Sequence, residues 1–260
     1  MTLVTFSDGQ LNVELPNGWH ELSQSELLAV YRLMAVFSAE ELPFEVFREL
    51  TGMELVRING DKYFVRVQAL ENDCKVRLFA EVTAMQLASC YEPLAWLSDP
   101  GKIPVRLDSV GGVNGVRADL HGLKFGAFLQ FENLYQGFLQ SRKPQSLCAM
   151  AAVLYPGFIR NCELQPWEEI NMINWAAQIK AMFAIQFPHL FRQADDESDA
   201  PSAMSMAEVM NNEIRALTGG DISKEDMVLS TDCWRALTEL DYKAKEAEDF
   251  NKEMAKYKNK

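Results

Sequence analysis

The most constraining feature of the sequence is an apolar residue at every third or fourth position between residues 233 and 257. This spacing predicts one long amphipathic helix, which begins near Ser230. Its seam is formed by Cys233, Leu237, Leu240, Ala244, Ala247, Phe250, Met254 and Tyr257. The other face carries opposite charges four residues apart, such as Glu239 and Lys243, which stabilise an exposed helical surface. Such a helix needs a second surface along its seam, either on its own body or on another protein.

Four large side chains along this helix are the predicted contacts with a partner. They are Trp234, Leu237, Leu240 and Phe250. Burial of each one supplies roughly 1.5 to 3 kcal/mol, whereas an exposed ion pair supplies only a few tenths. The sequence therefore predicts that the last helix recognises another protein through these four residues.

An acidic stretch that contains proline precedes this region, and its composition is typical of a linker. We place the linker at residues 193–204, between a main body of residues 1–192 and a C-terminal helical unit of residues 205–260. The unit begins with Ser205 and Glu208, which have the spacing of a capping box, and its first helix ends at Gly219 and Gly220.

The first part of the body, residues 1–70, combines short strands and helices. Alternating apolar residues flank an Asp8–Gly9 turn and an Asn59–Gly60 turn, which predicts two β-hairpins. Between them, Ser23 and Glu26 form the capping box of a helix, and a second helix ends at Gly52. The N-terminal part is therefore expected to be α+β.

The second part of the body, residues 75–192, is predicted to be helical. The apolar spacing places helices at residues 77–96, 125–139, 146–154 and 166–187. Residues 103–107 could form a strand at the edge of a sheet. A central strand is excluded because Pro104 has no backbone N–H to donate to a neighbouring strand. The whole chain is thus expected to be an α+β protein that is predominantly helical.

Charge and composition exclude several classes of partner. The net charge of −12 opposes binding to a phosphate backbone. No apolar stretch is long enough for a membrane span, and the N-terminal residues lack the pattern of a secretory signal. The five cysteines are odd in number and contain no C-x-x-C pair, which is typical of reduced thiols inside a cell. We therefore expect a cytoplasmic protein without nucleic-acid or membrane partners.

Residues suited to catalysis or metal binding are present but lack an informative spacing. Gly111 to Gly115 could cradle a phosphate, yet the P-loop Lys-Ser/Thr is missing, and a mobile loop is the preferred interpretation. His20 lacks a second histidine four residues later, and Cys148 lies within an apolar helical run. We predict no catalytic residue, metal or cofactor, so a small-molecule enzyme that uses the Gly111 loop is the least favoured alternative.

Two stretches resemble proteins that Bacteroidetes phages and prophages encode next to their tail genes. Residues 15–28, LPNGWHELSQSELL, are similar to the opening of that group, LP-x-x-W-x-EL-[ST]-x-x-Q/E-L. Residues 219–241 resemble the C-terminal element of phage tail assembly chaperones and nearby tail proteins. Residues 131–155 and 187–191 are similar to the middle of the same group.

The resemblance implies a non-enzymatic protein that helps tail-tube or tape-measure proteins assemble in a bacterial host cell. A structural component of the phage particle is the main alternative. The acidic charge, the linker and the terminal amphipathic helix fit a protein that holds a long helical partner. Association with further copies of the same chain is a second possible interaction.

Overall fold

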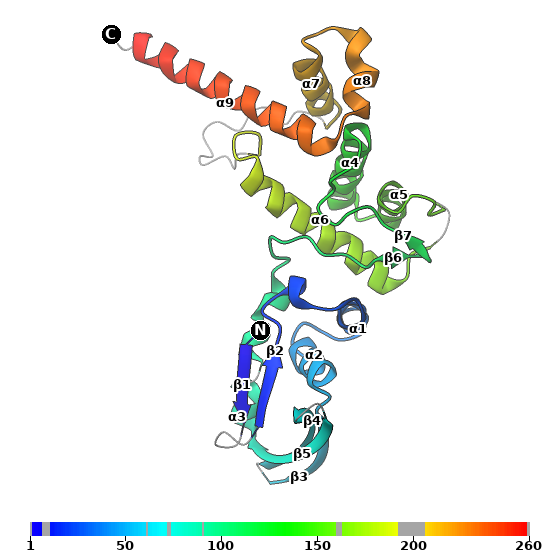
Figure 1. The fold of residues 1–260 in the computed structure, drawn as a ribbon, viewed down its shortest axis with the longest axis vertical. Coiled ribbons are helices and arrows are strands. Elements are labelled where there is room, and N and C mark those ends of the chain that lie inside the picture. The colour runs from blue at the N-terminus through cyan, green and yellow to red at the C-terminus, as the bar shows by residue number, and fades with distance from the viewer. Residues whose placement is uncertain are drawn as a thin grey trace. The chain divides into compact units, whose positions relative to one another are not determined.

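The computed structural model describes residues 2–6, 11–60, 62–71, 74–89, 91–159, 163–191 and 206–258. Helices predominate in these residues and the strands form small antiparallel sheets, which confirms the predicted α+β class (Figure 1). The chain divides into two compact units. Unit 1 is Met1–Leu107 with Gln165–Asn174, and unit 2 is Asp108–Leu164 with Trp175–Lys260.

Unit 1 contains two antiparallel sheets and short helices. Its strands and helices are β1 Thr2–Phe6, β2 Leu11–Leu15, α1 Gln24–Met34, α2 Leu42–Thr51, β3 Glu54–Asn59, β4 Lys62–Glu71, β5 Cys74–Thr83 and α3 Ala84–Ser89. The described part of the unit also contains the 3-10 helices Trp19–Glu21 and Glu92–Ser98. β1 pairs with β2, and β4 lies between β3 and β5. Both predicted strand pairs are therefore present, although the predicted Asp8–Gly9 turn lies outside the described residues.

The predicted ends of the first two helices are confirmed by their hydrogen bonds and backbone angles. The backbone N–H of Glu26 donates to Oγ of Ser23 at 3.3 Å, and the N–H of Ser23 donates to Oε2 of Glu26 at 2.8 Å. This is the reciprocal capping box at the start of α1. α2 ends at Gly52, whose φ of 62° is left-handed and therefore suits glycine.

Two local predictions in unit 1 are wrong. The helix expected at residues 77–96 is replaced over its first part by β5, which pairs with β4 along its whole length. The signal was an alternation of exposed Phe79 and Glu81 with buried Ala80 and Val82, which has the period of a strand. Residues 103–107, expected as an edge strand, contain no strand. The N–H of Leu107 instead donates to the buried Asn171 side chain at 2.8 Å.

Unit 2 is a helical assembly with one small hairpin. Its described elements are β6 Ser109–Val110, β7 Val113–Asn114, α4 Phe125–Ser141, α5 Pro144–Leu154, the second part of α6 Pro166–Gln186, α7 Met206–Thr218, the 3-10 helix Ile222–Lys224, α8 Glu225–Ser230 and α9 Cys233–Lys258. α4 contacts α5, α7, α8 and α9. Fully buried aromatic side chains, among them Phe128, Phe131 and Phe183, form the centre of this packing. The predicted helices at residues 125–139, 146–154 and 166–187 are confirmed within a few residues.

The compact units differ from the predicted division into residues 1–192 and 205–260. The C-terminal helices belong to one unit with residues 108–164, because backbone hydrogen bonds join the start of α4 to the start of α9. The N–H of Phe125 donates to the carbonyl of Thr231, and the N–H of Cys233 donates to the carbonyl of Leu123, both at 2.8 Å. These bonds join segments about a hundred residues apart and leave no local pattern in the sequence. The predicted linker and Ser205 lie outside the described residues.

Candidate partner-binding surface on α9

The start of α9 is fixed by a side-chain cap and by contacts with the segment before α4. Oδ1 of Asp232 accepts the N–H of Trp234 at 2.9 Å, and its Oδ2 accepts the N–H of Gly122 at 2.6 Å. Asp232 is therefore the N-cap of the helix, two residues later than the predicted start. Cys233 follows it and is fully buried, and burial raises the pKa of its thiol to about 12. A thiol that stays protonated is a packing residue and not a nucleophile.

Three of the four predicted contact residues lie inside unit 2. Leu237 is 0% exposed and Leu240 is 4% exposed. The indole N–H of Trp234 donates to the carbonyl of Asp119 at 2.6 Å, and its ring packs edge-to-face on Phe183. This corrects the prediction for Trp234, Leu237 and Leu240, because the first half of the seam packs on its own unit.

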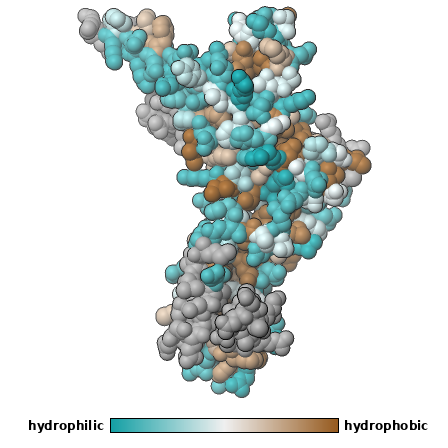
Figure 2. All heavy atoms as spheres, viewed as in Figure 1, coloured by the Kyte–Doolittle hydropathy of each residue, from teal (hydrophilic) through white to brown (hydrophobic). Residues whose placement is uncertain are grey.

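The second half of α9 has the opposite character. From Asp249 to Tyr257 every residue is exposed, including three large apolar ones. Phe250 is 62% exposed, Met254 is 44% exposed and Tyr257 is 75% exposed. Figure 1 shows this end of α9 extending away from α4, α7 and α8, and Figure 2 shows apolar side chains there among hydrophilic ones. We call Phe250, Met254 and Tyr257 the distal row.

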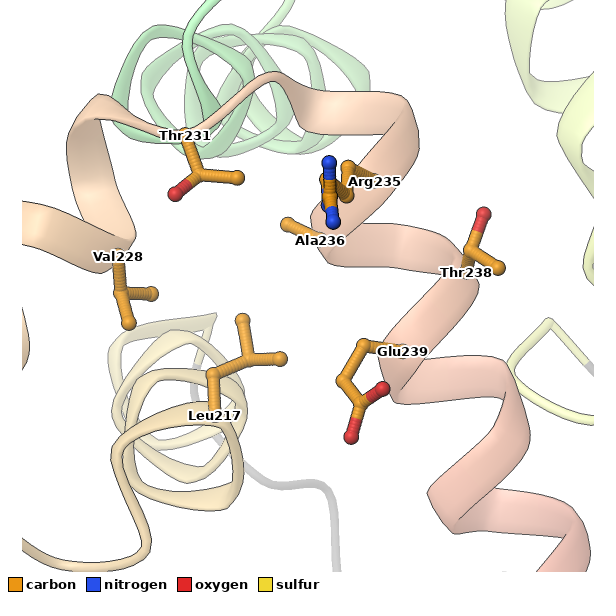
Figure 3. Close-up of a pocket in the computed structure, with 7 residues that line it drawn as sticks. All are labelled: Leu217, Val228, Thr231, Arg235, Ala236, Thr238 and Glu239. Carbon is orange, nitrogen blue, oxygen red and sulfur yellow. The ribbon is translucent and has the colours of Figure 1, made fainter.

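A groove lies at the anchored end of the same helix, between α7, α8 and α9. Its volume is about 400 Å³, and it is lined by Leu217, Val228, Thr231, Arg235, Ala236, Thr238 and Glu239. Figure 3 shows Leu217 and Val228 on one side of the open space and the α9 residues on the other. The groove thus combines apolar walls with one basic and one acidic side chain, as in sites that take an apolar anchor and orient it by charge.

The groove and the distal row lie on one face of α9. Ala236 and Met254 are 18 residues apart, which is five turns at 3.6 residues per turn. Glu239 and Phe250 are 11 residues apart, so their side chains leave the helix axis in directions that differ by only about 20°. At ~1.5 Å per residue the face extends over roughly 27 Å. A single helix laid along α9 could therefore cover both features.

Charged side chains on α4, α6 and α7 lie close enough to influence one another, and α7 forms one wall of the groove. Oε1 of Glu132 on α4 accepts Nζ of Lys180 on α6 at 2.8 Å, while its Oε2 has no hydrogen-bond partner among the described residues. Glu213 on α7 has its pKa raised to about 7, first by burial and then by the charge of Glu132, with Lys180 acting in the opposite direction. Leu217 of the groove lies one turn beyond Glu213. The helix that contributes Leu217 to the groove therefore also carries Glu213, a carboxyl whose pKa is about 7.

The glycine loop that could have cradled a phosphate is a tight turn. Gly111 and Gly112 connect β6 to β7, and their φ angles of 55° and 77° are both left-handed, as a two-residue hairpin turn requires. The side chain of Phe158 occupies the space beside Gly111. The mobile loop predicted for residues 111–115 is therefore corrected to an ordered hairpin.

Alanine substitutions at these two glycines are expected to differ in cost. A Cβ at Gly111 would lie 2.9 Å from Cε2 of Phe158, whereas at Gly112 it would meet no described heavy atom within 4 Å. Gly111→Ala should lower the free energy of unfolding by roughly 2 to 4 kcal/mol, and Gly112→Ala by only about 1 kcal/mol. Chemical denaturation of the two variants measures the difference. Equal losses would show that Phe158 does not close this turn.

The remaining candidates from the sequence do not come together as a site. His20 is exposed in unit 1, whereas His121 and His189 lie in unit 2. Cys148 is half-buried on α5. Among the described residues, no group of three or more His, Cys, Asp or Glu side chains is arranged to hold a metal ion. Sequence reasoning found the distal row through Phe250 but missed the groove, because its walls come from three separate helices.

Comparisons with known proteins add no relative: no family model, no curated protein and no solved structure matches this chain. Within the described part of the chain, no helix has the length and apolar character needed to cross a membrane.

Proposed function

We propose that this chain is a non-enzymatic protein that binds a helical segment of another protein along the exposed face of α9. The observation that carries the proposal is the distal row, three large apolar side chains that stay exposed on a helix whose first half buries its apolar residues in unit 2. Uncovered apolar residues on one helical face favour burial against a second helix. The groove between α7, α8 and α9 continues this face and can hold one further apolar side chain.

The partner we propose is a phage tail or tape-measure protein, which the chain would bind in the cytoplasm of a bacterial host cell during tail assembly. The resemblance of residues 15–28 and 219–241 to tail assembly chaperones and nearby tail proteins supports this partner. The net charge of −12 supports a protein partner over nucleic acid. Tape-measure proteins are expected to be long and helical, which suits a site built along one helix.

Substitutions in the distal row are expected to abolish capture of the partner without unfolding the chain. Phe250→Asp combined with Tyr257→Asp removes two exposed anchors, each able to supply roughly 1.5 to 3 kcal/mol when covered. We expect the recovery of tail proteins with the tagged chain to fall at least ~10-fold in cells that express the tail genes. Quantitative mass spectrometry of the pull-down measures this fall.

Lys245→Gln is the matched control, because it also changes an exposed residue of α9. It lies five residues from Phe250, about 140° away around the helix, and should leave recovery unchanged. Equal recovery with the row variant and the control would exclude the distal row as the binding site. Stoichiometric recovery of the chain from mature particles would favour the alternative role of a structural component.

A further inference from the structure

The exposed face of α9 contains two features that complement each other. The distal row presents large apolar side chains, and the groove five turns earlier presents a partly apolar space of about 400 Å³. The midpoint between Ala236 in the groove and Met254 in the row falls at Lys245. A two-fold axis that crosses the exposed face at this level along α9 would place the row of one copy over the groove of the next, and the reverse. This is the self-complementary geometry of an isologous dimer.

The charges on this face distinguish an antiparallel pair from a parallel one. In the antiparallel register, Glu253 of one copy faces position 237 of the other, which is two residues from Arg235. Glu246 faces position 244, which is one residue from Lys243. Symmetry makes each pairing occur twice, so opposite charges meet at four places. In a parallel pair, each of these residues would face its own copy, and like charges would repel.

We propose that a second copy of this chain occupies the α9 face, as an antiparallel α9–α9 pair in which each distal row lies over the other copy's groove. The proposal goes beyond the function given above, and it uses the same face. A helical partner must therefore displace the second copy, so self-association and partner binding compete. Self-association at this face would keep the distal row covered until a partner is present.

Charge reversal tests the pairing in the purified full-length chain. Wild-type protein should show a concentration-dependent monomer–dimer equilibrium in the micromolar range by sedimentation equilibrium. Arg235→Glu and Glu253→Arg alone should each weaken the dimer at least ~10-fold, because each places like charges opposite one another twice. The two changes combined restore opposite charges and should return the dissociation constant to within about threefold of wild type.

Each result decides the proposal. A chain that stays monomeric throughout this range overturns it, as do single variants that dimerise as well as wild type. A double variant as weak as the singles rejects the antiparallel register. Circular dichroism of all variants shows whether they stay folded, which is expected since Arg235 and Glu253 are both exposed. Because no tail protein is present, a negative result here leaves the partner pull-down unaffected, and a failed pull-down leaves this result unaffected.

Discussion

Replacing Leu237 by Asp is expected to unfold unit 2. Leu237 is 0% exposed on the anchored half of α9, so the substitution removes a buried side chain and introduces a charge with no partner. Truncation of such a leucine alone costs roughly 2 to 5 kcal/mol, and an uncompensated buried charge adds several more. The sum is comparable with the roughly 5 to 15 kcal/mol that stabilises a whole domain. Leu240→Asp, at 4% exposure, should have a similar effect.

Phe250→Asp provides the control, because it introduces the same charge on the same helix at a side chain that is 62% exposed. It should leave the melting temperature within a few degrees of wild type, since exposed substitutions usually change stability by about 0.5 kcal/mol or less. Hydrogen exchange of α4 and α9, compared with that of β4 in unit 1, reports which unit is lost. A Leu237→Asp variant with protected α4 and α9 amides would contradict the packing described for α9.

The stability of unit 2 is expected to depend on pH through the carboxyl of Glu213. Its pKa is raised from 4.5 to about 7 in the folded chain, so folding favours the protonated carboxyl. The stability that this proton provides is complete below about pH 4.5, falls as the pH rises toward 7, and is absent above pH 7. A shift of this size corresponds to a loss of up to about 3 kcal/mol between those limits.

Glu213→Gln replaces the carboxyl by a neutral amide and should remove most of this loss. We expect the variant to be more stable than wild type at pH 8 by about 2 to 3 kcal/mol and equally stable near pH 4. Glu225→Gln, the same substitution at an exposed position on α8, should leave the wild-type pH profile unchanged. Urea denaturation across this pH range measures both. Parallel profiles for wild type and Glu213→Gln would refute the assignment of the proton to Glu213.

The features of the fold that depend on residues adjacent in the sequence could be predicted from the sequence. The capping box of Ser23 and Glu26, the left-handed Gly52 and the pairing of β3 with β4 on either side of Gly60 each follow from the chemistry of a few adjacent residues. The strand β5 was missed because its apolar residues also fit a short helix, and only pairing with β4 decides between the two.

Only half of the candidate site could be predicted from the sequence, because the burial of a side chain depends on contacts between distant parts of the chain. The spacing of Leu237 and Phe250 along the seam is equally regular, yet one is covered by its own unit and the other is exposed. No local pattern distinguishes them. The cluster of Glu132, Lys180 and Glu213 was invisible for the same reason, since its members are contributed by three helices far apart in sequence.

The bonds that join the start of α4 to the start of α9 also set the order of events during synthesis. Gly122 and Asp232, which are 110 residues apart, must both have left the ribosome before they can pair. Unit 1 likewise requires Gln165–Asn174 to be complete. Closing such long loops is slow, and the part of α4 that contacts α9 stays uncovered until α9 has been translated. Translation of the last helix therefore controls when unit 2 becomes folded, and a ribosome that stalls before residue 233 leaves a chain whose second unit cannot close.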